Sequence, residues 1–356
     1  MTKRYSFFLI FIFLVHFNSK AQQNNYFFDL TGGSGRLVPH HPEIKPLAGA
    51  VSFFNLKFGI KTMGQKEWQR VFNYPEIGVG LSHNYLTSKS LGNPTAFYSF
   101  MNLPLSPSAK FKINLGINIG IAWGFNPSSP ENQINVAIGS KCDAYASLNL
   151  NTKFRIGKNF DLLLLAGGYH YSNGNMNKPN KGLNLLGAEA GVRYSIQKSA
   201  TERNVEPVVP IQKSSSILVF GAYGWKKEVT YATGFPVGSL SVGYYRTISH
   251  KSRWSTGIDF FLDEGALYYT QKENTLNNKL AYGIFGGHEL TISELSIVTQ
   301  IGLYLRNPNP RDPFYYERLG LRYTIAKRII PSLTLKAHEF KVDFVEWGLG
   351  FVLWKT

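Results

Sequence analysis

The sequence predicts an all-β chain, folded as an antiparallel outer-membrane β-barrel of about 14 strands. Three observations support this prediction: an aromatic-rich composition with few charges, repeated alternation of apolar and polar residues, and a secretory leader. Aromatic residues make up 15% of the 356 positions, glycine contributes 34, and 17% are charged, whereas an average soluble domain has roughly 25% charged residues. This composition argues against a disordered chain and, without long Ala/Leu/Glu/Lys stretches, against a helical one.

Residues 1–21 have the pattern of a secretory signal peptide. Lys3 and Arg4 precede the uncharged, mostly apolar run Tyr5–Phe17, and Ser19-Lys20-Ala21 supplies small residues at the positions that a signal peptidase reads. We expect cleavage before Gln22; an uncleaved anchor is the alternative. The run is shorter than the about 20 residues of a spanning helix, and no later segment is apolar enough to replace it. A membrane form of the mature chain is therefore expected to be a barrel.

Stretches of alternating residues, separated by Gly, Asn, Pro, Ser and Lys, recur along the chain and predict strands. The predicted strands are Ser52–Gly59, Ile77–Tyr85, Phe97–Leu105, Phe111–Phe125, Asn135–Ile156, Phe160–Tyr171, Leu185–Ile196, Ile217–Val229, Leu240–Ile248, Trp254–Thr270, Leu280–Ile292, Leu295–Leu305, Tyr315–Ile325 and Leu333–Phe351. The last stretch has a candidate bend near Lys341–Asp343 and is counted once. An even number of strands is typical of a closed outer-membrane barrel.

One face of these strands is apolar and the other is polar. Along Phe111–Ile121, every odd position is Phe, Ile or Leu, and every even position is Lys, Asn or Gly. Side chains at i and i+2 share one face of a strand, so the lipid-facing and lumen-facing sides of a membrane barrel would alternate in this way. A soluble β-sandwich is the alternative, but it rarely has so many strands of such length.

A polar stretch, residues 197–216, divides the predicted strands into two sets of seven. It contains Pro207, Pro210 and three consecutive serines. We interpret it as a loop within a single barrel domain that spans residues 22–356, because seven strands cannot close with the usual even number. Two stacked barrels are the alternative.

One segment, residues 169–184, has the residue types needed for nucleophilic catalysis. His170 and Ser172 are two positions apart, so a strand would point both side chains from the same face. An imidazole beside a hydroxyl can activate serine as a nucleophile. After a turn, Asn184 returns on the next strand, 14 residues beyond the histidine, where a polar group would fix the imidazole tautomer. By itself His-x-Ser is a weak motif, and a chance pair at a strand end is the more frequent explanation.

This segment resembles the lipid A 3-O-deacylase family, known more broadly as acyloxyacyl hydrolases. The family hallmark is His-x-Ser-Asn at a strand end, followed by a Pro-Asn turn and a polar triad residue. The matching positions are His170, Ser172, Asn173, Pro179, Asn180 and Asn184. The deacylase-like segment is residues 47–197, and further similar stretches, such as Gly287-His288-Glu289 and Glu317–Tyr323, extend the resemblance over nearly the whole mature chain.

The resemblance implies an outer-membrane serine esterase that hydrolyses an ester-linked acyl chain of lipid A without a cofactor or metal. It implies that His170 is the base, Ser172 the nucleophile and Asn184 the third triad member. Asn180, with Asn173 and the backbone amide near Gly174, would hold the oxyanion. The family usually has Glu at the third position, so the asparagine is a departure. Glu189 is the charged alternative, although it lies well along the strand.

Two alternatives remain open from the sequence. Outer-membrane phospholipase A also has His-x-Ser-Asn-Gly with an asparagine as third member, which suggests a phospholipid substrate; its calcium ligands have no secure match here. A porin or structural barrel without catalysis is the second alternative. The signal peptide would direct the chain to the outer membrane of a Gram-negative bacterium, with lipopolysaccharide or phospholipid and no nucleic acid as partner. Removal of three leader charges from +16 leaves +13, which suits lipid A phosphates but does not identify a partner.

Other histidines are candidates for lesser roles. His40 and His41 precede a proline, and we expect them in an ordered plug or periplasmic segment. His288-Glu289 and His338-Glu339 are expected to line a polar lumen.

Overall fold

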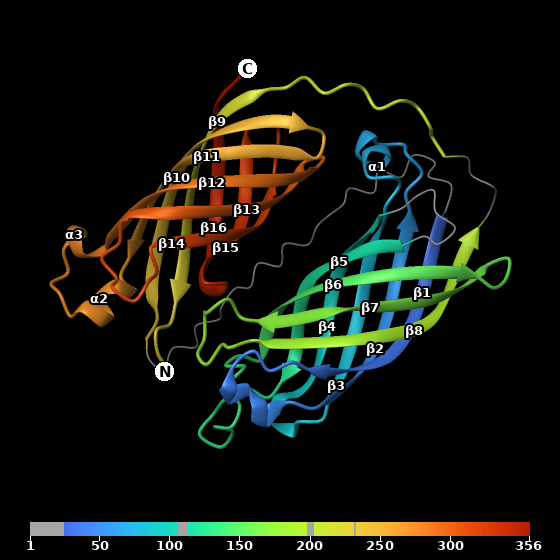
Figure 1. Cartoon of the computed structure of the whole chain (residues 1–356), viewed down its shortest axis with the longest axis horizontal. Coiled ribbons are helices and arrows are strands. Elements are labelled where there is room, and N and C mark those ends of the chain that lie inside the picture. Colours follow the sequence, from blue (N-terminus) through green and yellow to red (C-terminus); the bar gives the residue numbers. More distant parts are fainter. Residues whose placement is uncertain (1–24, 106–112, 198–202, 231–232) are drawn as a thin grey trace.

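Two closed antiparallel barrels of eight strands each follow one another along the chain (Figure 1). The computed structural model describes residues 25–105, 113–197, 203–230 and 233–356, so the expected signal peptide lies outside the described residues. β1–β8 form the first barrel and β9–β16 the second, and the pairs β1–β8 and β9–β16 close them. The predicted class, an all-β antiparallel barrel, is confirmed. Within the described ranges, no helix is long and apolar enough to cross a membrane.

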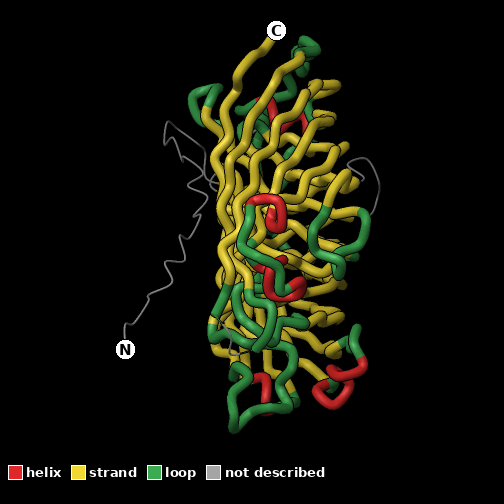
Figure 2. Tube along the Cα trace, turned by 90° about the vertical axis from the view of Figure 1, so that its left-hand side faces the viewer, coloured by secondary structure: helices red, strands yellow, loops and turns green. Residues whose placement is uncertain are grey.

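The strands are 9 to 15 residues long, and the short helices of the described residues lie in the connections between strands (Figure 2). The first barrel comprises β1 (Asn25–Leu37), β2 (Ala50–Lys61), β3 (Glu76–Leu86), β4 (Gly92–Pro104), β5 (Ile113–Phe125), β6 (Cys142–Arg155), β7 (Phe160–Ser172) and β8 (Leu183–Gln197). The second comprises β9 (Ser215–Lys226), β10 (Phe235–Ser249), β11 (Ser252–Asp263), β12 (Leu280–Ile292), β13 (Leu295–Arg306), β14 (Tyr315–Tyr323), β15 (Ile329–His338) and β16 (Lys341–Lys355). The helices are α1 (Glu67–Val71), α2 (Gly265–Thr270), α3 (Leu276–Lys279) and the 3-10 turns Pro42–Leu47 and Lys89–Leu91.

The expected single barrel of about 14 strands is wrong in two places, and both have a local cause. β1 is absent from the predicted strands because Gly32, Gly33 and Gly35 interrupt its alternation. The stretch Leu333–Phe351 is two strands, because Glu339 and Phe340, at φ 51° and 60°, form a two-residue turn between β15 and β16. Each side of the polar linker therefore has eight strands, and each side closes on itself.

Two further predicted strands are shorter than expected. The stretch Trp254–Thr270 ends as a strand at Asp263 and continues as α2, and the stretch Asn135–Ile156 begins as a strand only at Cys142. In both, apolar residues of a connecting loop pack against the barrel and extend the apolar pattern beyond the strand.

The barrels are polar inside and apolar outside. Along β1, Asp29 and Thr31 are buried in the lumen, whereas Phe28 and Leu30 are exposed on the outer face. Arg193 in the lumen is paired with two carboxylates: its guanidinium donates to Asp29 at 2.6 Å and to Glu76 at 2.7 Å. An apolar outer surface around a polar interior is the arrangement that a barrel needs in a lipid bilayer.

In the second barrel, Arg318 has the corresponding role. Its guanidinium donates to Asp259 at 3.0 Å, Glu346 at 2.7 Å and Gln300 at 3.0 Å, and it is 3% exposed. Replacement by methionine is expected to lower the free energy of unfolding by about 3–5 kcal/mol, because two buried carboxylates lose their cation. Urea unfolding of the full chain in detergent measures this. Arg328→Met, at an exposed turn, is the control, and a loss for Arg318→Met within about 1 kcal/mol of that control would contradict the prediction.

The two barrels lie side by side, and corresponding ends of the two barrels are on the same side of the molecule (Figure 1). One end has tight turns such as Ser249–Ser252 and also the β2–β3 connection with α1, where Lys251 Nζ is 4.9 Å from the Phe72 ring centroid. The other end has the loops with α2 and α3 and the hairpin 173–182 of the first barrel. Because outer-membrane barrels have short periplasmic turns and longer extracellular loops, this second end is expected to face the outside of the cell.

Candidate active site at the rim of the first barrel

His170, Ser172 and Asn184 meet on the outer face of the first barrel, at the end that carries the longer loops. β7 places His170 and Ser172 on the same face, as their spacing predicts, and β8 pairs Asn184 directly opposite His170. His170 Nε2 is 3.0 Å from Ser172 Oγ, and His170 Nδ1 is 2.6 Å from Asn184 Oδ1. The three side chains thus form one hydrogen-bonded chain with the spacing of a nucleophile, a base and an orienting group.

The alternative third member, Glu189, faces the opposite way. It is 5% exposed inside the lumen, where it accepts hydrogen bonds from Thr31 at 2.6 Å and Asn55 at 2.7 Å. Five residues separate it from Asn184, and an odd separation on a strand reverses the face. Glu189 is therefore excluded as a partner of His170 in this structure.

The hairpin between β7 and β8 contains the residues expected to hold an oxyanion. The backbone N–H of Asn173 donates to Asn180 Oδ1 at 3.1 Å, and the Asn173 side chain donates to Ser140 Oγ at 2.8 Å. Asn173 therefore fixes the hairpin to the neighbouring β5–β6 loop. Because the oxygen of the Asn180 amide accepts from a backbone N–H, its Nδ2 group is the end that remains for donation to a substrate.

Two glycines allow this hairpin to pass close to other groups. Gly182 has a φ of +72°, and a Cβ there would lie 3.0 Å from His170 Cε1. Gly174 has a φ of +64°, and a Cβ there would overlap the Val345 Cγ2 methyl of the second barrel. Glycine adopts positive φ without steric cost, so both positions depend on its missing side chain.

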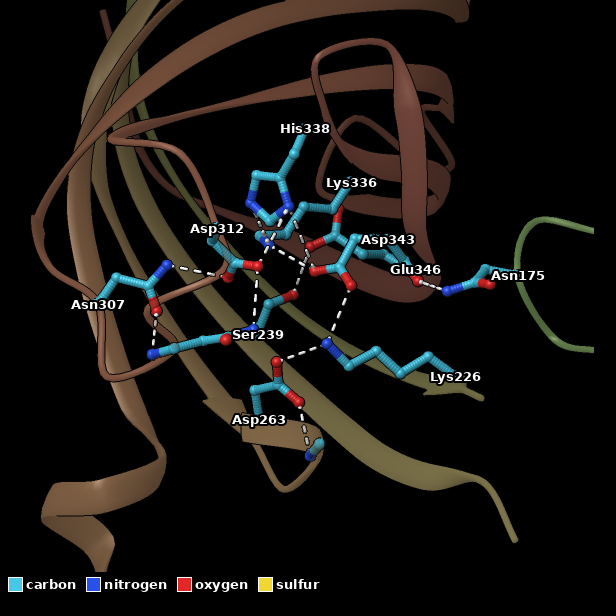
Figure 3. Close-up of polar contacts among 12 residues, drawn as sticks. Asn175, Lys226, Ser239, Asp263, Asn307, Asp312, Lys336, His338, Asp343 and Glu346 are labelled. Atoms are coloured by element: carbon cyan, nitrogen blue, oxygen red, sulfur yellow. Dashed lines mark hydrogen bonds and ion pairs between the residues drawn. The ribbon is translucent and has the colours of Figure 1, made fainter. Parts of the chain in front are cut away.

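The second barrel holds the tip of the hairpin. Asn175 Nδ2 donates to the Asp343 backbone carbonyl at 2.8 Å, and the Lys227 backbone N–H donates to Asn175 O at 3.2 Å. Figure 3 shows Asn175 beside the buried ion network of that barrel. In this network Asp343 accepts from Lys226 at 2.9 Å and Lys336 at 2.8 Å. A rigid group of ion pairs therefore fixes the strand end against which the hairpin packs.

Apolar and cationic groups surround the site. On the same outer face of β7, Leu162 and Leu164 are exposed below the histidine. On the hairpin, Lys181 Nζ lies 2.7 Å from Glu43 of the β1–β2 loop, and this hydrogen bond lowers the pKa of Glu43. Burial lowers the pKa of Lys178 as well. The site thus has an apolar wall on the outer face of β7 and, at the hairpin, a lysine paired with a carboxylate.

One residue of the site, His40, is not predicted there from the sequence. Instead of a plug or periplasmic segment, His40 lies in the β1–β2 loop at the site, with Nδ1 3.0 Å from Asn184 Nδ2 and Nε2 2.7 Å from Lys181 O. No local pattern could have indicated this contact, because 144 residues separate His40 from Asn184. His288 and His338 belong to the second barrel, where they hydrogen-bond Ser252 and Tyr304. Among the described residues, no group of three or more His, Cys, Asp or Glu side chains is arranged to hold a metal ion.

Two family models match the chain, one for each barrel. The model described as "Lipid A 3-O-deacylase (PagL)" matches residues 53–193, and the model described as "Acyloxyacyl hydrolase, C-terminal domain" matches residues 214–355. The boundary between the two matches falls at the polar linker. A search of curated proteins finds no match.

Solved outer-membrane proteins are only distantly similar. CdiB from Acinetobacter baumannii is 11% identical with a TM-score of 0.19; the match covers 95% of this chain but 61% of CdiB, so the chain spans less than two thirds of that protein. OccK11 (OpdR) from Pseudomonas aeruginosa is 11% identical with a TM-score of 0.22 and coverages of 93% and 95%. The ferric enterobactin receptor PfeA of the same species is 7% identical with a TM-score of 0.25 and coverages of 93% and 73%. Scores this low carry no functional argument.

Proposed function

The chain belongs to the lipid A 3-O-deacylase (PagL) family of acyloxyacyl hydrolases, and on this premise we propose that it removes an ester-linked acyl chain from lipid A with Ser172 as nucleophile. The observation that supports this most is the chain of hydrogen bonds from Ser172 Oγ through His170 to Asn184 Oδ1. The family and the barrel fold support a location in the outer membrane, where lipid A is found.

Acyl transfer begins at Ser172. His170 Nε2, 3.0 Å from Oγ, accepts the hydroxyl proton while the oxygen attacks the ester carbonyl. His170 then returns the proton to the departing sugar oxygen, which leaves an acyl-enzyme. A water molecule, deprotonated by the same imidazole, then attacks the acyl carbonyl, and His170 returns the proton to Ser172 Oγ as the fatty acid leaves. A positioned base of this kind contributes about 10²–10⁴-fold to the rate.

The hairpin supplies the groups for the negative charge that forms on the ester oxygen. We assign this role to Asn180 Nδ2 and the backbone amide at Gly174, with Asn173 as the support that holds both in place. Such donors act on the charge of the transition state, and loss of one costs about 10²–10³-fold. The outward orientation of His170 and Ser172, above Leu162 and Leu164, suits a substrate whose acyl chain stays in the lipid layer.

A phospholipid is the second candidate substrate. The asparagine at position 184 favours it, because the resemblance to outer-membrane phospholipase A rests on the same residue. A porin function has less support: Arg193 and Arg318, each with its carboxylate partners, fill the lumens with buried ion pairs.

The test uses the purified full chain in detergent with lipid A and, separately, with phosphatidylethanolamine. Mass spectrometry of the lipid A is expected to show the loss of one hydroxyacyl chain, and a fluorophosphonate is expected to label the peptide that contains Ser172. Release of fatty acid from phosphatidylethanolamine alone would replace lipid A by a phospholipid. If neither substrate changes and the folded protein is not labelled, the catalytic proposal fails.

A further inference from the structure

His40 makes two hydrogen bonds at the site, one as a donor and one as an acceptor. Its Nε2 is 2.7 Å from the Lys181 backbone carbonyl, and its Nδ1 is 3.0 Å from Asn184 Nδ2. A carbonyl oxygen only accepts, so Nε2 carries the proton. A neutral imidazole has one donor and one acceptor, so Nδ1 accepts from the Asn184 amide.

This contact decides which end of the Asn184 amide faces His170. With its NH₂ group donating to His40, Asn184 presents Oδ1 to His170 Nδ1 at 2.6 Å. Oδ1 only accepts, so Nδ1 of His170 carries the proton, and the lone pair of Nε2 faces Ser172. A flipped amide would present NH₂ to His170 Nδ1 and turn a protonated Nε2 toward the serine, and a protonated nitrogen cannot act as a base.

We propose that His40 is a positioning residue of this enzyme: it fixes the orientation of the Asn184 amide and thereby the tautomer of His170. The proposal rests on the triad proposed above. It explains how an asparagine serves at a position where a carboxylate would need no such help, because both oxygens of a carboxylate accept hydrogen bonds.

The loop is held so that His40 stays in place. The Val38 backbone N–H donates to Asn184 O at 2.8 Å, next to the last β1–β8 pair, Leu37–Leu185. Lys181 Nζ also bridges to Glu43 at 2.7 Å. The β1–β2 loop is therefore joined at three points to the hairpin and to the start of β8, and one of these points is His40 itself.

The test compares His40→Ala in two backgrounds. With Asn184 present, His40→Ala is expected to lower kcat on lipid A by about 10–100-fold and to leave KM within threefold of the wild type. This is a part of the loss of about 10⁴-fold that a wrong histidine tautomer causes in a serine protease. In an Asn184→Asp background, the same change is expected to alter kcat by less than threefold. His40→Gln, whose side-chain oxygen can accept from Asn184, is expected to recover much of the activity.

His41→Ala is the matched control, because His41 lies in the same loop and, among the described residues, its ring contacts only the His40 ring, at 4.8 Å. Its kcat is expected to stay within threefold of the wild type. Heat-modifiable migration on gels verifies that each variant is folded. An equal loss from His40→Ala in both backgrounds, or no loss with Asn184 present, overturns the proposal. If Ser172→Ala is as active as the wild type, the proposed triad fails instead.

Discussion

Ser172→Ala is expected to lower the rate of lipid A deacylation by about 10⁴-fold or more. Among the described residues, this hydroxyl is the only hydrogen-bond partner of His170 Nε2, at 3.0 Å. Without it, the proposed site has no nucleophile for the ester carbonyl. Substrate binding and the oxyanion donors remain, so a small residual activity is expected. Mass spectrometry of lipid A from cells that express each variant measures the effect.

Ser52→Ala is the matched control for this variant. Ser52 lies near the same end of the first barrel, and it is exposed on the outer face of β2. Its activity is expected to equal that of the wild type. Full deacylation by a folded Ser172→Ala protein would show that another group attacks the ester, and the assignment of the nucleophile would be wrong.

Gly174→Ala is expected to lower kcat by about 10²-fold, the effect of misplacing catalytic groups by about 1 Å. The substitution adds a methyl group that overlaps Val345 Cγ2, and a non-glycine residue at a φ of +64° adds roughly 1–2 kcal/mol of strain. The hairpin must therefore move away from the second barrel, and Asn180 moves with it. Initial rates of fatty-acid release from lipid A measure the loss.

Val345→Ala tests the cause of this effect. A Cβ on residue 174 would be 3.8 Å from Val345 Cβ, so the double variant Gly174→Ala/Val345→Ala no longer has the overlap and keeps only the backbone strain. Its kcat is expected to lie at least tenfold above that of Gly174→Ala alone. Gly286→Ala, where a Cβ meets nothing within 4 Å, is the control. If the double variant is no better than Gly174→Ala, the second barrel does not constrain the hairpin.

Through these contacts, the second barrel is expected to support the proposed catalytic site. It contributes no residue to the chain of hydrogen bonds at the site, yet Asn175 and Gly174 of the hairpin pack against it. The residues expected to hold the oxyanion lie within this hairpin, so their positions depend on the contacts between the hairpin and the second barrel. The buried ion pairs around Asp343 make that support rigid.

The local features of the site were predictable from the sequence. Strand periodicity puts His170 and Ser172 on one face, because residues two apart on a strand always share a face. Asn184 follows after a short hairpin, and a hairpin brings nearby segments together without help from the rest of the fold. The class of the protein was likewise predictable, because alternation over about ten residues is a property of each strand by itself.

The number of barrels was not predictable in this way. It depended on β1, whose glycines hide the alternation, and on a two-residue turn at Glu339–Phe340. The number of strands determines whether a barrel can close. Without these two strands, the sequence predicts one barrel of about 14 strands in place of two barrels of eight.

The sequence by itself determined the lipid-facing pattern, the all-β class and the His170–Ser172 pair, because each follows from the period of a strand. The tertiary structure alone decided which residues distant in the chain complete the site. β1 pairs with β8 in a register that ends at Leu37–Leu185, and this closure brings His40 to Asn184 across 144 residues. The docking of the second barrel similarly brings Val345 to Gly174. Both contacts depend on ring closure and barrel packing, which no local pattern of residues encodes.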